Sequence, residues 1–215
     1  MSKPAFLVVD TIGPWCACAV KAGDRIVMRA EEIGRGHAEA LAPMVEDCLS
    51  EAGVSPQSLT RIGVNVGPGG FAGTRVGVAF ARGLALSTGA KALGVSNLDA
   101  LALRTDPKGE RTVMAIHDAR RGDLVWRLYT HGRPVTDICH GNAHDAQDEM
   151  EAFGGLYLTG SGAALVGADP SHFDPAPPLR ELLQLTEAAP DDAPSPSPLY
   201  ARPPDAKLPG GHTPA

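Results

Sequence analysis

VGPGGFAGTRVGVAFARGLAL, residues 66–86, is the stretch that decides how the rest of this chain is read. It sets Gly67, Gly69, Gly70 and Gly73 between an apolar run typical of a strand and a stretch with helical spacing. Such a turn has two physical interpretations. It is a tight connection that only glycine allows, or it is a loop whose backbone N–H groups bind a phosphate. A glycine run alone is a weak motif and does not decide between them.

The helix that we predict over residues 74–88 carries almost no charge. Arg75 and Arg82 are its charged side chains, and small residues recur at 73, 77, 81 and 85. A helix that is apolar nearly all round is normally buried on more than one side, but one lobe of a small protein covers only one. We therefore predict that the small residues form a ridge against which a helix of another molecule packs.

A second helix, predicted over residues 36–52, has an apolar stripe wider than one sheet face requires, and its Met44 is of a type common at adaptable interfaces. We predict that the two helices together form a docking surface for a protein partner or a second copy of the chain. The candidate interface residues are His37, Leu41, Met44, Val45, Cys48, Thr74, Val78, Ala81 and Arg82. The alternative is that both are ordinary core helices.

In the rest of the chain, the same order of predicted strands and helices occurs twice. The first set has strands at 5–10, 15–21, 24–32, 61–66 and 91–96 and a third helix at 97–104, and the second has three strands within 111–138, a helix at 145–153 and a strand at 155–160. The repeat predicts an α/β protein of two lobes with a cleft between them. We expect residues 1–105 to form the first lobe and 106–189 a shortened second lobe.

The end of the chain differs in composition. Of the 19 prolines, 12 lie between Pro170 and Pro214, and one helix, at 179–189, interrupts this region. Each Pro removes a backbone donor and restricts the residue before it, so residues 190–215 are predicted to be a linker and a surface strap. We expect Leu199 and Tyr200 to anchor the strap by burying apolar surface, and the last eight residues to be disordered.

Bulk properties narrow the classes of function. The chain has 215 residues, 43% of them hydrophobic, a net charge of -6 and four cysteines that fit neither a disulfide framework nor paired CxxC motifs. The negative charge gives no general attraction to nucleic acid. No signal peptide and no membrane-spanning run is recognised, so we expect a cytoplasmic protein with no membrane contact.

Six motifs in order carry a resemblance to a known family. They are VVDT, GHAEALAPMVEDCL, VGPGGFAGTRVGVAFARGLAL, GVSNLDAL, DARRGDLVW and PLYARPPDAK, and with them the chain resembles the TsaB (YeaZ) family over residues 4–207. The resemblance implies an actin-like, RNase H-like fold of the sugar kinase and heat-shock ATPase superfamily. It also implies a non-catalytic subunit for synthesis of threonylcarbamoyladenosine in tRNA. Its expected partners are a TsaD-type catalytic subunit, a TsaE-type ATPase and, alone, a second copy, with tRNA met only through the complex.

Residual nucleotide contact is the second hypothesis for the glycine turn. Its candidates are Asp10, Gly67, Gly69, Gly70, Gly73, Gly160 and Gly162, and Asp118 is placed like a second magnesium-side carboxylate. The family form suggests Ser and Thr where this chain has Gly70 and Ala72, and Pro14 and Trp15 obstruct the first hairpin. We therefore expect no cofactor beyond weak ATP or ADP contact, and no catalytic residue.

Two enzyme classes remain as alternatives. One is an actin-like ATPase or kinase that uses both glycine loops. The other is a metal-dependent, glycoprotease-like peptidase, for which His140 and His144 are four residues apart but interrupted by Gly141 and Asn142. The family resemblance points to a His pair in the first-lobe helix, where this chain has only His37, so we expect no metal site. Arg120 and Arg121 form a charged turn that is solvated by default.

Overall fold

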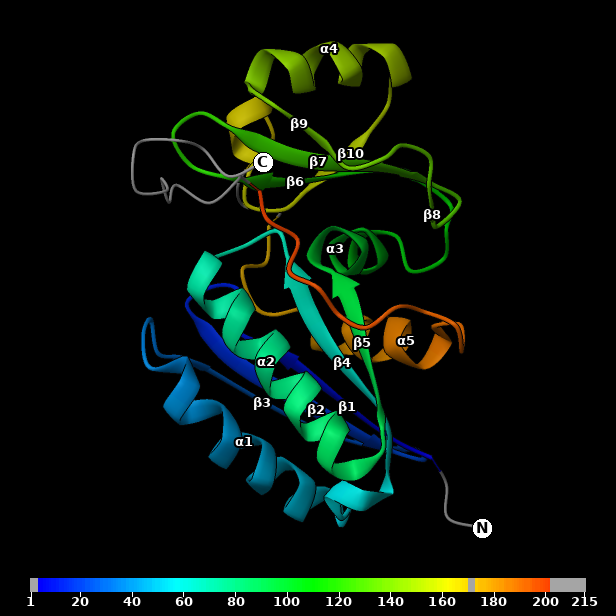
Figure 1. Cartoon of the computed structure of the whole chain (residues 1–215). Coiled ribbons are helices and arrows are strands. Elements are labelled where there is room, and N and C mark those ends of the chain that lie inside the picture. Colours follow the sequence, from blue (N-terminus) through cyan, green and yellow to red (C-terminus); the bar gives the residue numbers. More distant parts are fainter. Residues whose placement is uncertain (1–3, 170–172, 202–215) are drawn as a thin grey trace.

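The computed structural model describes residues 4–169 and 173–201, and it has two lobes that are each built on one β-sheet (Figure 1). The α/β class and the two lobes predicted from the repeated pattern are both present. The first sheet has the spatial order β3 (Arg25–Glu32), β2 (Trp15–Ala22), β1 (Ala5–Asp10), β4 (Leu59–Gly67) and β5 (Lys91–Ser96). A short 3₁₀ helix, η1 (Pro56–Ser58), precedes β4.

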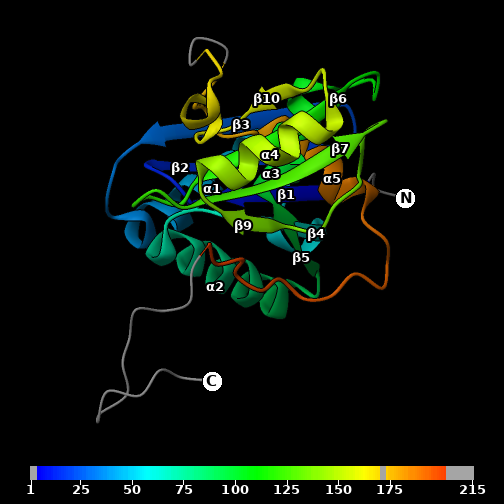
Figure 2. The same ribbon diagram turned by 90° about the horizontal axis from the view of Figure 1, so that it is seen from above.

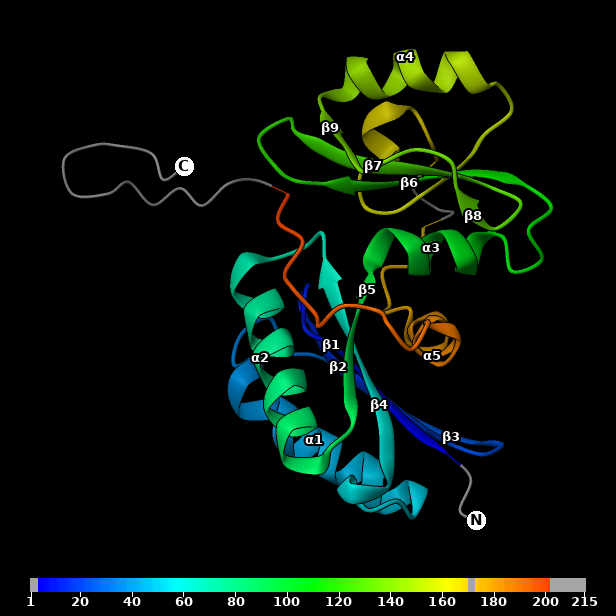
Figure 3. The same ribbon diagram turned by 45° about the vertical axis from the view of Figure 1, so that its right-hand side comes forward.

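The first sheet is covered by helices on both faces. α1 (His37–Ala52) and α2 (Phe71–Thr88) pack on one face, and α5 (Leu179–Ala188) packs on the other (Figures 1 and 3). Along β1, Leu7 lies in the core beneath α1 and α2, whereas Phe6 and Val8 lie in the core beneath α5. This double coverage explains why the sequence of β1 is continuously apolar instead of alternating.

The second lobe is smaller. Its sheet has the order β10 (Tyr157–Thr159), β6 (Thr112–Asp118), β7 (Leu124–Thr130) and β8 (Arg133–Pro134), and β9 (Cys139–Gly141) also pairs with β7. α3 (Asn97–Thr105) packs on one face, while α4 (Ala143–Phe153) and the 3₁₀ helix η2 (Ala163–Val166) pack on the other. Figure 2 shows α4 lying across this sheet.

Several predicted elements are displaced in the structure. α2 begins at Phe71 instead of 74, and Gly70 is its N-cap. α4 begins two residues before the predicted 145, because Asn142 and Asp145 form a reciprocal capping box. The third strand predicted within 111–138 is reduced to β8, which has two residues.

The predicted division at residue 189 also differs from the structure. We expected residues 106–189 to form the second lobe, but α5 packs against β1, β2, β4 and β5 of the first sheet. Its buried side chains Leu179, Leu182 and Leu183 complete that core, which sequence order alone does not reveal. The second lobe therefore ends before α5, and the chain returns to the first lobe.

The described part of the strap lies on the first lobe. The guanidinium group of Arg61 donates to the carbonyls of Thr186 and Glu187 at 3.1 and 3.0 Å and pairs with Asp191 at 2.6 Å, which ties the end of α5 to β4. Leu199 then donates its N–H to Val66 O at 2.8 Å. Leu199 packs against the first core and Tyr200 stacks on Phe71, in agreement with the prediction that these two residues anchor the strap. The predicted disordered end lies outside the described residues.

Among the described residues, none of the helices has the length and apolar character that would let it cross a membrane.

Candidate functional site

The small residues of α2 face the sheet and not a partner. A Cβ at Gly73 would overlap the carbonyl oxygen of Thr11, and a Cβ at Gly77 would lie 2.7 Å from Thr11 Oγ1 and 3.1 Å from Val64 Cγ2. Ala81 is fully buried in the same core. The predicted ridge therefore allows α2 to lie unusually close to its own sheet. The four-residue spacing was correct, but the face was assigned to the wrong neighbour.

Eight of the nine residues predicted for the interface are buried inside the molecule. They are His37, Leu41, Met44, Val45, Cys48, Thr74, Val78 and Ala81, all at most 9% exposed, whereas Arg82 is exposed. His37 Nε2 lies 3.1 Å from Gly13 O, and Thr74 Oγ1 donates to Gly70 O at 2.9 Å, so both polar groups are satisfied locally. These eight side chains hold α1 and α2 on the sheet. A partner that docks here must contact the opposite sides of both helices.

The opposite side of α2 carries an apolar stripe, which we call the outer stripe. It consists of Ala72, Val76, Ala79, Gly83 and Leu86, with sequence intervals of four, three, four and three. Leu86 is 90% exposed, Val76 is half-buried and the other three are exposed small residues. Alternating intervals of four and three keep side chains on one line of a helix, and small residues on that line admit a second helix at close range. This alternation is present in the sequence beside the strict four-residue spacing of the inward side.

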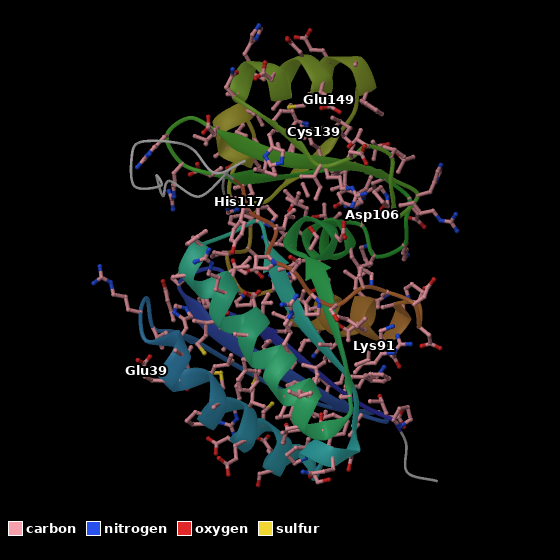
Figure 4. All side chains as sticks on the ribbon, in the orientation of Figure 1. Glu39, Lys91, Asp106, His117, Cys139 and Glu149 are labelled. Carbon is pink, nitrogen blue, oxygen red and sulfur yellow. The ribbon has the colours of Figure 1, made fainter. Side chains whose placement is uncertain are left out.

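The exposed side of α1 lies beside α2 on the same face of the molecule and is acidic (Figure 1). Its exposed carboxylates are Glu39, Glu46, Asp47 and Glu51, and we call the first three the acidic rim. Glu39 points away from the body of the molecule (Figure 4). Glu51 is paired with Arg29 at 2.8 Å. Arg75 and Arg82 of α2 are also exposed. An apolar stripe beside an acidic rim suits a protein with a basic border better than it suits a polyanion.

Around the glycine turn, the first hairpin packs directly against the glycines. Gly70 donates its N–H to Ile12 O at 2.6 Å, and a Cβ at Gly69 would lie 2.6 Å from Ile12 Cβ. Gly67 has φ of 103°, and a Cβ there would lie 2.8 Å from the carbonyl oxygen of Leu199 in the strap. The glycines thus allow three backbone segments to meet at one point. This geometry favours the tight connection over the phosphate loop.

Asp10 lies at the end of β1 and is only 3% exposed. Its two oxygens accept from the N–H of Ile12 at 3.1 Å and from Asn65 Nδ2 at 2.8 Å, and Asn65 Nδ2 also reaches Asn97 Oδ1 at 3.2 Å. Burial raises the pKa of Asp10 above the ordinary range, although these hydrogen bonds act in the opposite direction. The carboxylate is therefore part of a closed polar network at the floor between the lobes.

On the second lobe, the predicted Gly160 and Gly162 pack against β6. A Cβ at Gly160 would overlap the carbonyl oxygen of Ile116, and one at Gly162 would lie 2.8 Å from Ile116 Cγ2. Gly160 also borders a cavity of about 710 Å³ that reaches Leu101 and Phe173. The second-lobe glycine loop therefore keeps open space beside it, unlike the turn at Gly67 to Gly73.

Asp118 and its neighbours form a local hydrogen-bond network at the end of β6. Asp118 Oδ1 accepts from the N–H of Arg120 at 2.7 Å, and Ser161 Oγ lies 3.1 Å from the N–H of Asp118 and 3.3 Å from His117 Nδ1. Burial lowers the pKa of His117, which therefore favours the neutral imidazole (Figure 4). Arg120 and Arg121 both have positive φ, at 68° and 58°, so the charged turn is also a tight hairpin.

His140 and His144 come from different elements, because one lies in β9 and the other in α4. Both are exposed, and His144 Nδ1 faces Asp148 at 3.7 Å. Within residues 4–169 and 173–201, no group of three or more His, Cys, Asp or Glu side chains is arranged to hold a metal ion. Cys16, Cys18 and Cys48 are buried, and Cys139 lies beside α4 near Glu149 (Figure 4).

The start of α2 carries an aromatic and cationic cluster that sequence reasoning missed. The guanidinium carbon of Arg75 lies 3.7 Å from the centre of the Phe71 ring and 5.6 Å from that of Tyr200. Arg75 Nε donates to Tyr200 OH at 2.8 Å, and the two rings are 4.9 Å apart. The strap therefore fixes the first turn of α2, from which the outer stripe begins.

This arrangement of two lobes defines a protein of the actin-like ATPase fold. The ethanolamine utilization protein EutJ from Carboxydothermus hydrogenoformans is similar in fold, with a TM-score of 0.50 and 10% identity over 86% of this chain and 91% of that chain. Residues 29–165 match the TsaD family model, which is described as tRNA N6-adenosine threonylcarbamoyltransferase.

Two closer relatives define the family. The tRNA threonylcarbamoyladenosine biosynthesis protein TsaB of Escherichia coli (strain K12) is 32% identical over 161 residues, which is 71% of this chain and 69% of the E. coli protein. A crystal structure of a Pseudomonas aeruginosa protein with similarity to the peptidase YeaZ has a TM-score of 0.74 and 27% identity, and covers 93% of this chain and 100% of its own. The chain belongs to the TsaB (YeaZ) family.

Proposed function

We propose that this chain takes part in the biosynthesis of threonylcarbamoyladenosine in tRNA as a non-catalytic subunit. It binds and activates a TsaD-type catalytic subunit, in an assembly that also contains a TsaE-type ATPase. The observation that carries the proposal is the outer stripe on α2 beside the acidic rim on α1. The name of the E. coli relative and the match to the TsaD family model support the choice of pathway and partner.

The chemistry of the outer face favours a protein partner over RNA. Ala72, Ala79 and Gly83 leave the backbone of α2 accessible, so a partner helix can approach it closely and cover Leu86. Carboxylates of the acidic rim would repel tRNA phosphates and attract a basic partner surface. We therefore propose that tRNA is met only through the complex, and that the same face pairs two copies when the partner is absent.

The proposal that the chain is non-catalytic rests on two features between the lobes, the packing of the glycine turn and the hydrogen bonds of Asp10. The first hairpin fills the glycine turn through the Gly70 to Ile12 hydrogen bond, and Asp10 is held by Asn65 and the Ile12 N–H. Neither arrangement leaves the convergent donors that a triphosphate needs. We propose only weak ATP contact, at the cavity that Gly160 borders. Steady ATP turnover by the purified chain that is lost in an Asp10→Asn variant would contradict this part of the proposal.

Copurification with a TsaD-type subunit tests the pairing, and a tRNA modification assay with and without this chain tests the activation. The decisive variant is Ala79→Glu, which places a charge in the centre of the outer stripe on an exposed helical position. We expect at least a tenfold loss of affinity and a matching loss of modification, since a buried unpaired charge is strongly unfavourable. Charged residues at Met44 or Val78 would be uninformative, because both side chains are buried in the core.

Ala152→Glu is the matched control, because it makes the same change on an exposed position of α4 in the other lobe. Circular dichroism and thermal unfolding of both variants establish that each is folded. If Ala79→Glu pairs and supports modification as well as Ala152→Glu does, the outer stripe is not the docking surface.

A further inference from the structure

The outer edge of the first sheet is open. β3 is the terminal strand in the sheet order, and it pairs with β2 along all eight of its residues, from Arg25 to Glu32. In the part of the chain that the structure describes, no strand pairs with its other side (Figure 3). A long edge strand presents a row of backbone N–H and C=O groups that can pair with another strand.

The two faces of β3 are different. Val27 is buried in the core beneath α1, whereas Ile26 and Met28, on the opposite face, are 38% and 40% exposed. Met28 is opposite the buried Ala19 of β2, so this face continues the core that α5 covers. Most proteins protect such an edge with charges along it, but here Ile26, Val27 and Met28 are apolar, and the charge of Arg29 is paired with Glu51 of α1.

The charges of β3 fit a second copy of the same strand. In an antiparallel pair related by a two-fold axis at Met28, each Arg25 is opposite Glu31 of the other copy, and each Ile26 is opposite Ala30. Directly opposed residues point to the same face and have Cβ atoms about 5 Å apart, so two opposite-charge pairs form on either side of the Met28 pair. Each Val27 is opposite Arg29 of the other copy, and the Arg29 guanidinium group is already paired with Glu51 of its own chain at 2.8 Å. A register centred on Arg29 would instead place two guanidinium groups together. Of the two registers that pair seven residues of β3, centred on Met28 or on Arg29, charge therefore favours the one at Met28, in which Glu32 lies beyond the paired residues.

We propose that β3 pairs with β3 of a second copy about a two-fold axis at Met28, which joins the two first sheets into one continuous sheet. This interface is separate from the outer stripe, since β3 lies at the sheet border and the stripe lies on α2. A TsaD-type partner bound at α2 therefore leaves the β3 edge open. One strand pair buries little area, so the dimer is weak and depends on concentration.

A charge-exchange experiment tests the proposal by sedimentation velocity over a range of concentrations. All chains carry Ala79→Glu, which removes association through the outer stripe. We expect this parent chain to form dimers, and Arg25→Glu or Glu31→Arg alone to weaken them by about tenfold or more, because each change creates two like-charge pairs. In a mixture of the two variants, both pairs between positions 25 and 31 are again of opposite charge. A mixed dimer therefore forms with affinity close to that of the parent.

The mixed dimer also shows that each variant is folded, because Arg25 and Glu31 are both exposed and an unfolded chain could not restore pairing. A matched control exchanges Arg133 on β8 for Glu and leaves the dimer unchanged. Three results would overturn the proposal: a parent chain that stays monomeric up to its solubility limit, single variants that associate as the parent does, or a mixture that fails to associate. None of these results bears on docking of a TsaD-type partner at α2.

Discussion

At the scale of single residues, the polar side chains between the lobes satisfy one another by hydrogen bonds and do not form an open reaction centre. Asp10 is the clearest case. Its carboxylate is buried in a network with Asn65, yet the two hydrogen bonds it accepts do not fully offset the loss of hydration, so its pKa remains raised. A residue with this property makes a pH-dependent contribution to stability.

Asp10→Asn should change how stability depends on pH. In the unfolded chain the carboxyl titrates at about 3.9, below its folded pKa, so the unfolded state loses its proton first as the pH rises. The contribution of Asp10 to wild-type stability therefore falls as the pH rises from about 4 through the folded pKa, and is constant above it. The free energy of unfolding of Asp10→Asn, measured relative to wild type by urea denaturation, should increase across this window. A difference that stays flat would show that the carboxylate is not desolvated.

Arg61 is a second residue with more than a local effect, because its guanidinium group caps the last carbonyls of α5 and holds Asp191 of the strap. Arg61→Ala leaves the carbonyls of Thr186 and Glu187 without this donor, which should lower stability by about 1–3 kcal/mol. Arg61→Lys keeps the charge but cannot supply several donors in a plane, so it should give an intermediate value. Thermal unfolding measures both, and a Lys variant as stable as wild type would reduce the role of Arg61 to charge alone.

At the scale of elements, periodicity predicted that α1 and α2 exist but not which neighbour each face meets. The small residues at 73, 77 and 81 suit a helix that packs closely on either a sheet or another helix, and sequence spacing is the same in both cases. Similarly, β8 was overestimated, because after Val135 the N–H of Leu128 donates to the Thr136 side chain at 3.2 Å and the regular backbone pairing stops. α5 was placed in the wrong lobe because three of its partner strands, β1, β2 and β4, are more than 100 residues earlier in the chain. Long-range packing of this kind leaves no local signal.

The inward and outward faces of α2 can be compared by making the same Gly→Ala change on each. Gly73→Ala should destabilise the protein by about 2–3 kcal/mol, because its Cβ would overlap the Thr11 carbonyl and force backbone movement. Gly83→Ala, on the outer stripe, meets nothing within 4 Å and should stabilise the helix by about 0.5–1 kcal/mol. Chemical denaturation of both variants measures the difference. Equal effects would mean that the inward and outward faces have been assigned incorrectly.

At the scale of the whole molecule, α3 joins the two lobes into one cooperative unit. Leu98 and Leu101 pack into the core of the second sheet, whereas Ala100 on the same helix packs into the core beneath α5. The C-cap residue after α3 is Asp106 (Figure 4), whose carboxylate accepts the N–H groups of Glu110 and Arg111 at 2.9 Å each. Burial alone would raise the pKa of Asp106, but these hydrogen bonds outweigh it and lower the pKa. The connection between the lobes is thus fixed by packing and by charge.

Two tryptophans allow this coupling to be measured, since Trp15 lies in β2 of the first lobe and Trp126 in β7 of the second. Trp126 is buried in the core beneath α4, and Trp15 is half-buried, so each reports on its own lobe. In the single-tryptophan variants Trp15→Phe and Trp126→Phe, fluorescence and circular dichroism should give the same urea midpoint within each variant, because a shared helix cannot leave one core without disrupting the other. A fluorescence transition that precedes the loss of secondary structure would mean that the lobes unfold separately and that α3 belongs to only one of them.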